Sequence, residues 1–573
     1  MENDRSSYEA AVAALMSPLH QATDKESLEK SAARRIKTVA DMRNYWGRIQ
    51  WGTDGNTAPP PKKMIHITGT KGKGSTACLC QAILRSHGYS TGLFTSPHLM
   101  DIRERIRLDG RPVHPNIFAK AYWKIRNDLE AHEKSSNHED DDIPCLPGYF
   151  RMLTLMAFYI FSQVQVDVWI IEVGMGGRYD ATNFLDRDFI VERSICGVTL
   201  LDFDHTRILG NTLELIAWEK GGIFAVDKAK TTGLTRKPEE SQREEKNDEV
   251  ASLDRTTPND KLSSHYILDS NTEGVLQVFR QCATNEGCGG ALRLVDAKGV
   301  SLRQALGNIP LGLAGEHQYG NANLAVHLCH EAVATANGGD AQGSLPILEF
   351  LYDNQTLQGL AHAQWPARCQ TVQTCGSPFT FRLDGAHTPQ SLSATMQWFT
   401  QLAEINPRRV LVFNCSHERN PVELMDLLKH GRFTAVYFAK PDSTRPSPVA
   451  KQSARQLLEE ANIKVQPDWI SSVLQGTEVE TWQETLGILW KHVMASVTPP
   501  PSEIAASNHR HTQHYSIPII CNKTASEILQ DLATTIIEPT EVLVTGSLYI
   551  VGSFLTALEW KEESSEDRSS LLH

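Results

Sequence analysis

A glycine-rich segment near the start of the chain carries residues whose types and spacing point to chemistry. An apolar run, Ile65-His66-Ile67, leads into Gly69-Thr70-Lys71-Gly72-Lys73-Gly74-Ser75-Thr76, and apolar residues at helical spacing follow. Glycines let consecutive backbone N–H groups converge on an anion, and the N-terminus of a helix adds positive charge. Lys73 would supply a mobile cation, and Ser75 or Thr76 a hydroxyl for Mg²⁺. The segment predicts a strand, a phosphate loop and a helix that bind a nucleotide triphosphate.

The spacing of this loop departs from the common P-loop consensus. Ile67 stands where the first consensus glycine belongs, and Gly74 separates Lys73 from Ser75. The alternative is a glycine-rich turn within a lysine-rich surface loop. The strand and helix periodicities on either side favour the phosphate loop.

Two further strands are expected to end in polar residues. The apolar run 166–171 leads into Glu172 and a glycine-rich turn, and the run 195–201 leads into Asp202-Phe203-Asp204-His205. In open α/β sheets, ligands bind outside the carboxyl ends of the strands, where Glu172 and His205 could hold a hard cation. For Glu172, a helix cap or a buried ion pair is the alternative.

Two more candidate positions have structural alternatives. Lys220 ends a predicted helix, so it could act chemically or only stabilise the helix dipole. Ser96-Pro97-His98 follows the expected strand 92–95, but His98 could be an ordinary loop histidine. The arginines at 103, 105 and 107 could equally form a solvated face.

Length and composition limit the class of protein. At 573 residues with 40% apolar content, two domains of unequal size are expected. The net charge of −12, with charges of both signs interspersed, argues against a nucleic-acid partner. Eleven cysteines without a C-x-x-C pair, no membrane-length apolar run and an acidic start predict a soluble, cytoplasmic protein without a disulfide framework or membrane insertion.

The chain is expected to divide at Trp365-Pro366. Residues 1–364 would form a nucleotide- and substrate-binding domain with a low-hydrophobicity insert at 228–263. Residues 365–573 would form a smaller α/β domain, because strands at 379–383, 410–413, 435–439 and 542–544 alternate with helical patterns, which is typical of a parallel sheet. Its first strand ends in Asp384-Gly385-Ala386-His387.

Seven segments in a fixed order carry a family resemblance. They are Gly69-Thr70-Lys71-Gly72-Lys73-Gly74-Ser75, Ser96-Pro97-His98-Leu99, Glu172-Val173-Gly174-Met175-Gly176-Gly177, Asp204-His205-Thr206, Glu219-Lys220-Gly221-Gly222-Ile223, Leu383-Asp384-Gly385-Ala386-His387 and Val544-Thr545-Gly546-Ser547-Leu548. Together they resemble the folylpolyglutamate synthase family, within the Mur ligase-like superfamily. Leu146-Pro147-Gly148-Tyr149-Phe150 is similar to its eukaryotic branch.

The resemblance implies a fold and a reaction. The fold would be α/β: a P-loop-containing, Mur ligase-like central domain with a parallel sheet, and a smaller Rossmann-like C-terminal domain that completes an active site between the two. The reaction would use ATP to phosphorylate the γ-carboxylate of a folate, after which the amine of L-glutamate displaces phosphate from the acyl phosphate. The partners would be these small molecules, and the protein would be a monomer with a cytoplasmic or additional mitochondrial pool.

The resemblance also implies roles for individual residues. Ser75, Glu172 and His205 would hold Mg²⁺, with a monovalent cation such as K⁺ as a further option, and a carbamate on Lys220 would add an oxygen ligand. Lys73 would contact the β- and γ-phosphates, with Lys220 and His205 completing the catalytic set. The residues 69–76 and Asn321, Arg368, Asp384 and His387 would bind ATP, and Ser96, Pro97, His98, Tyr149 and Phe150 would bind folate.

Three positions depart from the family pattern. Ala367 replaces a glycine before Arg368, Ser416-His417-Glu418-Arg419 replaces a Thr-Gly-Asp-Arg-like turn, and Asn271 stands near a usual glutamine. Two alternatives remain open: a dihydrofolate synthase with the same fold and chemistry, and a folate- or nucleotide-binding protein without activity.

Overall fold

The structure is a computed structural model. It describes residues 2–21, 34–51, 59–135, 143–185, 193–224, 263–285, 292–334, 345–374, 376–402, 408–416, 419–442, 482–495 and 517–562. Of the predicted insert 228–263, all but Ser263 lies outside the described residues.

Two compact units are formed by discontinuous parts of the chain. Unit 1 contains residues 1–312, 317–364 and 562–573, and unit 2 contains residues 313–316 and 365–561. The chain passes from one unit to the other at four points, and the domain boundary predicted between residues 364 and 365 is one of them. The other three crossings have no signature in composition.

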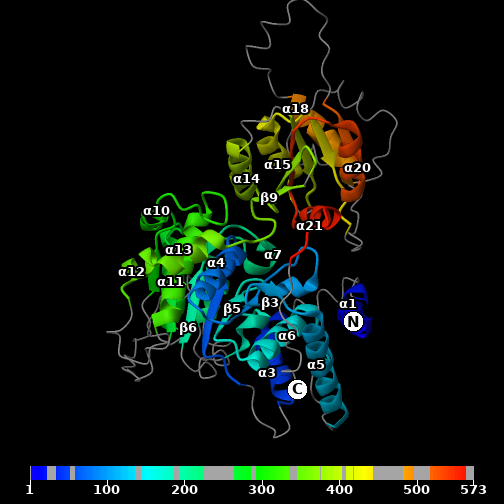
Figure 1. The fold of residues 1–573 in the computed structure, drawn as a ribbon. Helices are drawn as coiled ribbons and strands as arrows, with labels where there is room; N and C mark the ends of the chain where they lie inside the picture. Colours follow the sequence, from blue (N-terminus) through cyan, green and yellow to red (C-terminus); the bar gives the residue numbers. More distant parts are fainter. Residues whose placement is uncertain are drawn as a thin grey trace, which may run out of the picture. The chain divides into compact units, whose positions relative to one another are not determined.

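Unit 1 is built on a sheet of eight strands in the order β4-β3-β2-β5-β1-β6-β7-β8 (Figure 1). The strands are β1 (Lys63–Thr68), β2 (Thr91–Phe94), β3 (Ile106–Leu108), β4 (Arg111–Pro112), β5 (Val168–Glu172), β6 (Arg193–Val198), β7 (Ser263–Leu268) and β8 (Leu292–Val295). Among the described strands of this sheet, the antiparallel pairs are β2–β3 and β3–β4. Strand β1 is buried throughout because parallel strands lie on each side of it and helices cover both faces.

The helices of unit 1 pack on opposite faces of this sheet. They are α1 (Glu2–Gln21), α3 (Thr38–Arg48), α4 (Lys73–Ser86), α5 (Pro115–Ser135), α6 (Tyr149–Val164), α7 (Thr206–Leu209), α8 (Leu213–Gly221), α9 (Glu273–Asn285), α10 (Val300–Leu306), α11 (Gln318–Ala334), α12 (Ile347–Tyr352) and α13 (Asn354–His362). Short 3₁₀ helices are η1 (Arg34–Lys37), η2 (Ile102–Arg105), η3 (Ala181–Phe184) and η5 (Gly222–Phe224). Trp169 and Ile171 of β5 join one core with α1, α3, α5 and α6. Because side chains alternate along a strand, Glu172 shares the other face with Ile170.

Unit 2 has its own sheet of six strands in the order β13-β12-β11-β14-β10-β9 (Figure 1). The strands are β9 (Gln370–Gln373), β10 (Phe379–Leu383), β11 (Arg408–Phe413), β12 (Ala435–Phe438), β13 (Ile519–Cys521) and β14 (Thr540–Thr545). The helices are α14 (Pro389–Leu402), α15 (Pro421–Leu428), η6 (Lys429–Gly431), α18 (Trp482–Ala495), α20 (Ala525–Thr535) and α21 (Leu548–Ala557). Only β9 runs antiparallel to its neighbour, so the predicted parallel sheet is confirmed.

Within the described ranges, no helix combines the length and the apolar content that a membrane crossing requires. The nine described cysteines are all free thiols.

Candidate active site

The turn between β1 and α4 requires glycine at two positions. Gly69 has φ of +141° and Gly72 has φ of +87°, conformations that residues with a Cβ rarely adopt. A Cβ at Gly69 would lie 1.8 Å from Thr199 Oγ1, and a Cβ at Gly72 would lie 2.3 Å from Asn321 Oδ1. The backbone therefore passes so close to its neighbours that no side chain fits at either position.

Carbonyl groups from the loop after β6 hold the glycine turn in place. The N–H groups of Thr70 and Lys71 both donate to the Leu200 carbonyl, at 3.0 and 3.2 Å, and Thr70 Oγ1 donates to the Asp202 carbonyl at 3.0 Å. These two N–H groups are thus used inside the protein. An α-helix leaves the N–H groups of its first turn without partners inside the helix. The first turn of α4 begins at Lys73. We expect an anion to bind there.

The first turn of α4 carries the two side chains predicted for nucleotide binding. Lys73 Nζ donates to the Thr70 carbonyl at 3.3 Å, so the ammonium lies beside the loop. The buried Ser75 Oγ accepts a bond from Gln318 Nε2 at 3.4 Å, and Asn321 Nδ2 donates to Gln318 Oε1 at 2.9 Å. Asn321, which the resemblance assigns to ATP binding, lies inside α11 and not at its start, because this helix begins at Gln318.

Glu172 ends β5 directly beside the strand that precedes the loop. In the sheet register it pairs with Ile67 of β1, and its side chain is 4% exposed. Its Oε2 accepts a bond from the Ser96 N–H at 2.9 Å, and Ser96 begins the cis Ser96–Pro97 peptide. The Glu172 carboxylate, a predicted metal ligand, is therefore bonded to the loop that carries the predicted folate residues. In the sequence these are separate segments.

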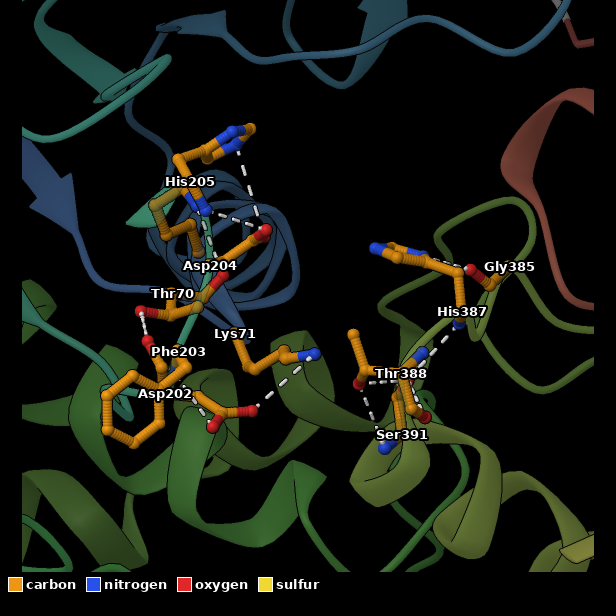
Figure 2. Close-up of polar contacts among 11 residues, drawn as sticks. Thr70, Lys71, Asp202, Phe203, Asp204, His205, Gly385, His387, Thr388 and Ser391 are labelled. Atoms are coloured by element: carbon orange, nitrogen blue, oxygen red, sulfur yellow. Dashed lines mark hydrogen bonds and ion pairs between the residues drawn. The ribbon is translucent and has the colours of Figure 1, made fainter. Parts of the chain in front are cut away.

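The loop that follows β6 presents His205 to solvent. His205 has a left-handed backbone with φ of +50°, and its side chain is 54% exposed (Figure 2). Its Nε2 lies 4.0 Å from Asp204 Oδ2, and its N–H donates to Asp204 Oδ1 at 3.0 Å. In the same loop, Asp202 Oδ2 lies 3.8 Å from Lys71 Nζ. An exposed imidazole on a short loop can reach a ligand without reorganising the core.

Lys220 lies at the end of α8 with its amine buried beside the glycine turn. Lys220 Nζ donates to the Gly69 carbonyl at 2.7 Å, and the residue is 4% exposed. Burial lowers the pKa of Lys220 well below its usual value, and the nearby Lys73 charge lowers it further. A neutral amine is the form that can react with carbon dioxide. The hydrogen bond to Gly69 lies outside the lysine's own helix, so Lys220 has a contact that the alternative of a lysine acting only on the helix dipole does not include.

The predicted folate residues are joined by an arginine that sequence reasoning left as a possible solvated side chain. Arg105 is buried, its Nε donates to His98 Nδ1 at 2.9 Å, and its guanidinium lies 5.5 Å from the centre of the Tyr149 ring. The Phe150 ring packs on Phe94 with centroids 5.7 Å apart. The solvated-face alternative is therefore wrong for Arg105, and the adjacency of residues 98 and 149 has no sequence signal.

In unit 2, the Asp384 carboxylate accepts hydrogen bonds from three donors of the protein. Its Oδ2 accepts from the Cys369 N–H at 2.8 Å, and its Oδ1 accepts from the Ala386 N–H at 2.9 Å and from Thr395 Oγ1 at 2.8 Å. The neighbouring His387 Nδ1 lies 2.8 Å from the Gly385 carbonyl (Figure 2). Asp384 therefore organises the turn that carries Arg368 and His387.

The donor set around the glycine turn can be compared with what a metal requires. Within the described ranges, no three His, Cys, Asp or Glu side chains gather into a metal-binding group. Ser75 and Glu172 instead offer two hard oxygen donors, both nearly buried. Mg²⁺ commonly takes one or two protein oxygens and completes its shell with water and phosphate. Two protein oxygens therefore suit Mg²⁺ better than a metal ion whose ligands all come from the protein.

Comparisons with known proteins were made at the level of sequence and fold. A scan against protein-family models finds no match. The chain is 36% identical over 393 residues to the human mitochondrial folylpolyglutamate synthase, covering 65% of this chain but only 58% of that protein. It is 30% identical over 505 residues to a putative folylpolyglutamate synthase of Caenorhabditis elegans, covering 86% of this chain and 81% of the relative.

The fold agrees with a solved structure. The chain superposes with a TM-score of 0.60 and 20% identity on Mycobacterium tuberculosis folylpolyglutamate synthase complexed with ADP and AMPPCP, covering 96% of this chain and all of that one. This likeness confirms the expected two-sheet α/β fold. The sequence identity to the C. elegans relative extends over most of both chains, so the chain belongs to the folylpolyglutamate synthase family.

Proposed function

We propose that the chain is an ATP-dependent ligase that adds L-glutamate to the γ-carboxylate of tetrahydrofolate or a related folate. The observation that carries this proposal is the turn at Gly69 and Gly72, which admits no side chain and leads into a helix bearing Lys73 and Ser75. Family membership supports the choice of substrates, and the M. tuberculosis relative was crystallised with ADP and an ATP analogue.

The reaction would proceed in two balanced steps. A γ-carboxylate oxygen attacks the γ-phosphorus of ATP, the bond to ADP breaks, and an acyl phosphate forms. The neutral amine of glutamate then attacks the acyl carbon, phosphate leaves with the bridging oxygen, and the amine loses a proton. Because two anions must approach each other in the first step, neutralisation and positioning supply most of the rate enhancement.

Residues of unit 1 would carry the phosphate chemistry. Lys73 and the N–H groups of the first turn of α4 would hold the β- and γ-phosphates. Ser75, Glu172 and His205 would hold Mg²⁺, which when bound neutralises phosphate charge. The buried Thr76 Oγ1 makes no hydrogen bond among the described residues, which supports a polar guest at this loop. Lys220, as a carbamate, would add an anionic oxygen donor.

Other residues would bind the remaining parts of the substrates. Asn321 in unit 1 and Arg368, Asp384 and His387 in unit 2 would contact ATP, with Arg368 on phosphate. Both Asp384 oxygens already accept bonds from the protein, so its contact with the ribose would be shared with its structural role. The folate would bind at Ser96, Pro97, His98, Tyr149 and Phe150, where Arg105 adds a buried cation.

The protein would act as a monomer in the cytoplasm, with a mitochondrial pool as a further location. Nine free cysteines among the described residues support a reducing compartment. Light scattering of the purified chain and fractionation of cells test these two points. A stable dimer, or a chain found only in mitochondria, would contradict them.

The decisive experiment offers two acceptors to the purified chain. ATP, Mg²⁺ and L-glutamate are supplied with either tetrahydrofolate or dihydropteroate, and products are resolved by mass. We expect glutamate to be added to tetrahydrofolate in successive single steps, with one ADP formed per addition. Product from dihydropteroate alone would identify a dihydrofolate synthase, and no product from either acceptor would indicate a binding protein without ligase activity.

A further inference from the structure

Arg35, in the short helix η1, reaches a carboxylate far along the chain. Its Nη1 donates to Glu219 Oε1 at 3.0 Å and its Nη2 donates to Glu219 Oε2 at 2.6 Å, across 184 residues of sequence. The side chains are 20% and 5% exposed. Two parallel charge-assisted bonds fix both the distance and the angle between the partners. Glu219 is therefore held in one orientation from outside its own helix.

Glu219 precedes Lys220 in the last turn of α8. The Glu219 carbonyl accepts a bond from the Arg178 N–H at 2.7 Å, while Lys220 Nζ donates to the Gly69 carbonyl at 2.7 Å. Adjacent helix residues point in different directions, so Arg35 acts on Lys220 by fixing the helix turn and not by touching the amine.

Arg35 also contacts the glycine-rich turn that follows Glu172. Its guanidinium lies 5.2 Å from the centre of the Tyr179 ring. Gly176, in the same turn, lies near both members of the ion pair: a Cβ there would be 3.4 Å from Arg35 Nη2 and 3.7 Å from Glu219 Oε2. One side chain thus ties together the turn after Glu172 and the helix end that carries Lys220.

We propose that Arg35 is a positioning residue for the transfer reaction. It holds the end of α8 and the turn after Glu172 in register, so that Lys220 and Glu172 approach the glycine turn together. This inference rests on the proposed ligase function.

The neighbouring arginine provides a matched control. Arg34 makes the same kind of paired contact, with Nε 3.0 Å from Asp41 Oδ2 and Nη2 3.2 Å from Asp41 Oδ1, and the exposed fractions are 20% and 4%. Asp41 lies only seven residues away and also binds Arg151 at 2.8 Å. Arg34 therefore resembles Arg35 in chemistry and burial, but its partner is not next to a predicted catalytic residue.

The test compares wild type with Arg35→Ala, Arg35→Lys and Arg34→Ala in the ligase assay, together with their thermal unfolding. For Arg35→Ala we expect kcat to fall about 10- to 100-fold, as is typical when a residue that orients the residues of a site is lost. The KM values should change by no more than about threefold, since substrate contacts are kept. Arg35→Lys should recover part of kcat, because lysine restores the charge but not the paired geometry. Arg34→Ala should lower the melting temperature comparably while kcat stays within about threefold.

A double-mutant cycle shows whether Arg35 acts through Glu219. If it does, Arg35→Ala combined with Glu219→Gln should lower kcat no more than the worse single change. Independent, additive losses in kcat would overturn the proposal, as would an equal loss of kcat in Arg34→Ala. Failure of wild type to form product would instead refute the ligase function, so the two failures are distinguishable.

Discussion

Two of the turns with positive φ in this molecule can be compared directly, because they adopt these backbone conformations with different residues. The turn in unit 1 uses Gly69 and Gly72, whereas the turn in unit 2 has Ala367 at φ of +59° and Cys369 at φ of +46°. In unit 1 both the backbone angle and the lack of space exclude a side chain. In unit 2 the buried Ala367 side chain is accommodated, so only the angle is unfavourable.

The two turns also differ in what holds them. Carbonyl groups of Leu200 and Asp202 hold the unit 1 turn, and the amine of Lys220 binds its Gly69 carbonyl, which leaves the helix N-terminus beyond it to face an anion. A carboxylate, Asp384, holds the unit 2 turn by accepting from two backbone N–H groups. We infer that the first turn is shaped to receive an anion from a ligand, while the second turn is held by the Asp384 carboxylate of the protein itself.

The largest effect is expected from the cation of the first turn. Lys73→Ala should reduce transition-state stabilisation by about 3 kcal/mol or more, because a positioned charge facing developing negative charge is lost. The measurement is kcat/KM with a thermal scan to verify folding. Turnover within about tenfold of wild type would show that the turn does not work as a phosphate site.

Gly69→Ala tests the role of space in the first turn. The added Cβ would meet Thr199 Oγ1, so we expect a destabilisation of about 3 kcal/mol by denaturant unfolding. Gly88 is the control, since it has φ of +81° but nothing within 4 Å of a Cβ. Gly88→Ala should therefore cost only about 1 kcal/mol, the price of the angle alone. Equal losses for the two variants would contradict the steric argument.

Asp384→Asn tests whether the Asp384 carboxylate holds the turn in unit 2. An amide nitrogen cannot accept a bond, so at least one buried donor among those of Cys369, Ala386 and Thr395 would lose its partner. We expect unit 2 to lose about 2 kcal/mol of stability, as for a bond to a charged group. Unchanged unfolding with a raised KM for ATP would assign this carboxylate to the ligand alone.

The smallest effect is expected at Ala367. Ala367→Gly should leave the stability within about 0.5 kcal/mol of wild type, because relief of the left-handed angle, about 1–2 kcal/mol, is offset by the entropic cost of glycine, about 0.5–1 kcal/mol, and by the lost burial of the methyl group, about 0.8 kcal/mol. Ala386, which is also buried but has no positive φ, is the control. Ala386→Gly relieves no strained angle and should therefore destabilise by about 1–2 kcal/mol, and equal losses for the two variants would refute the argument.

Much of the fold follows from local patterns in the sequence. The strand, glycine turn and helix at 63–86 and the buried strand that ends at Glu172 are found where the sequence predicts them. Apolar runs, glycine and helical periodicity are signals within about ten residues, and each element depends mainly on them. The start of α1 is an exception: the spacing of Ser6 and Glu9 is that of a capping box, which predicts a helix start at Ser6, but the helix begins at Glu2.

The contacts that complete the site could not be predicted in the same way. Arg35 with Glu219 and Arg105 with His98 and Tyr149 are side-chain pairs set by how distant segments pack. An arginine that will be buried beside a carboxylate looks, in sequence, like one on a solvated surface. The additional crossings between the units have no local signal for the same reason.

The most direct test of the account follows one oxygen atom. Folate labelled with ¹⁸O in its γ-carboxylate is incubated with the chain, ATP, Mg²⁺ and glutamate, and the released phosphate is examined by mass. Attack of the carboxylate on the γ-phosphorus predicts that one labelled oxygen appears in each phosphate released. Glutamylated product accompanied by unlabelled phosphate would contradict the acyl phosphate, and with it the role assigned to the glycine turn.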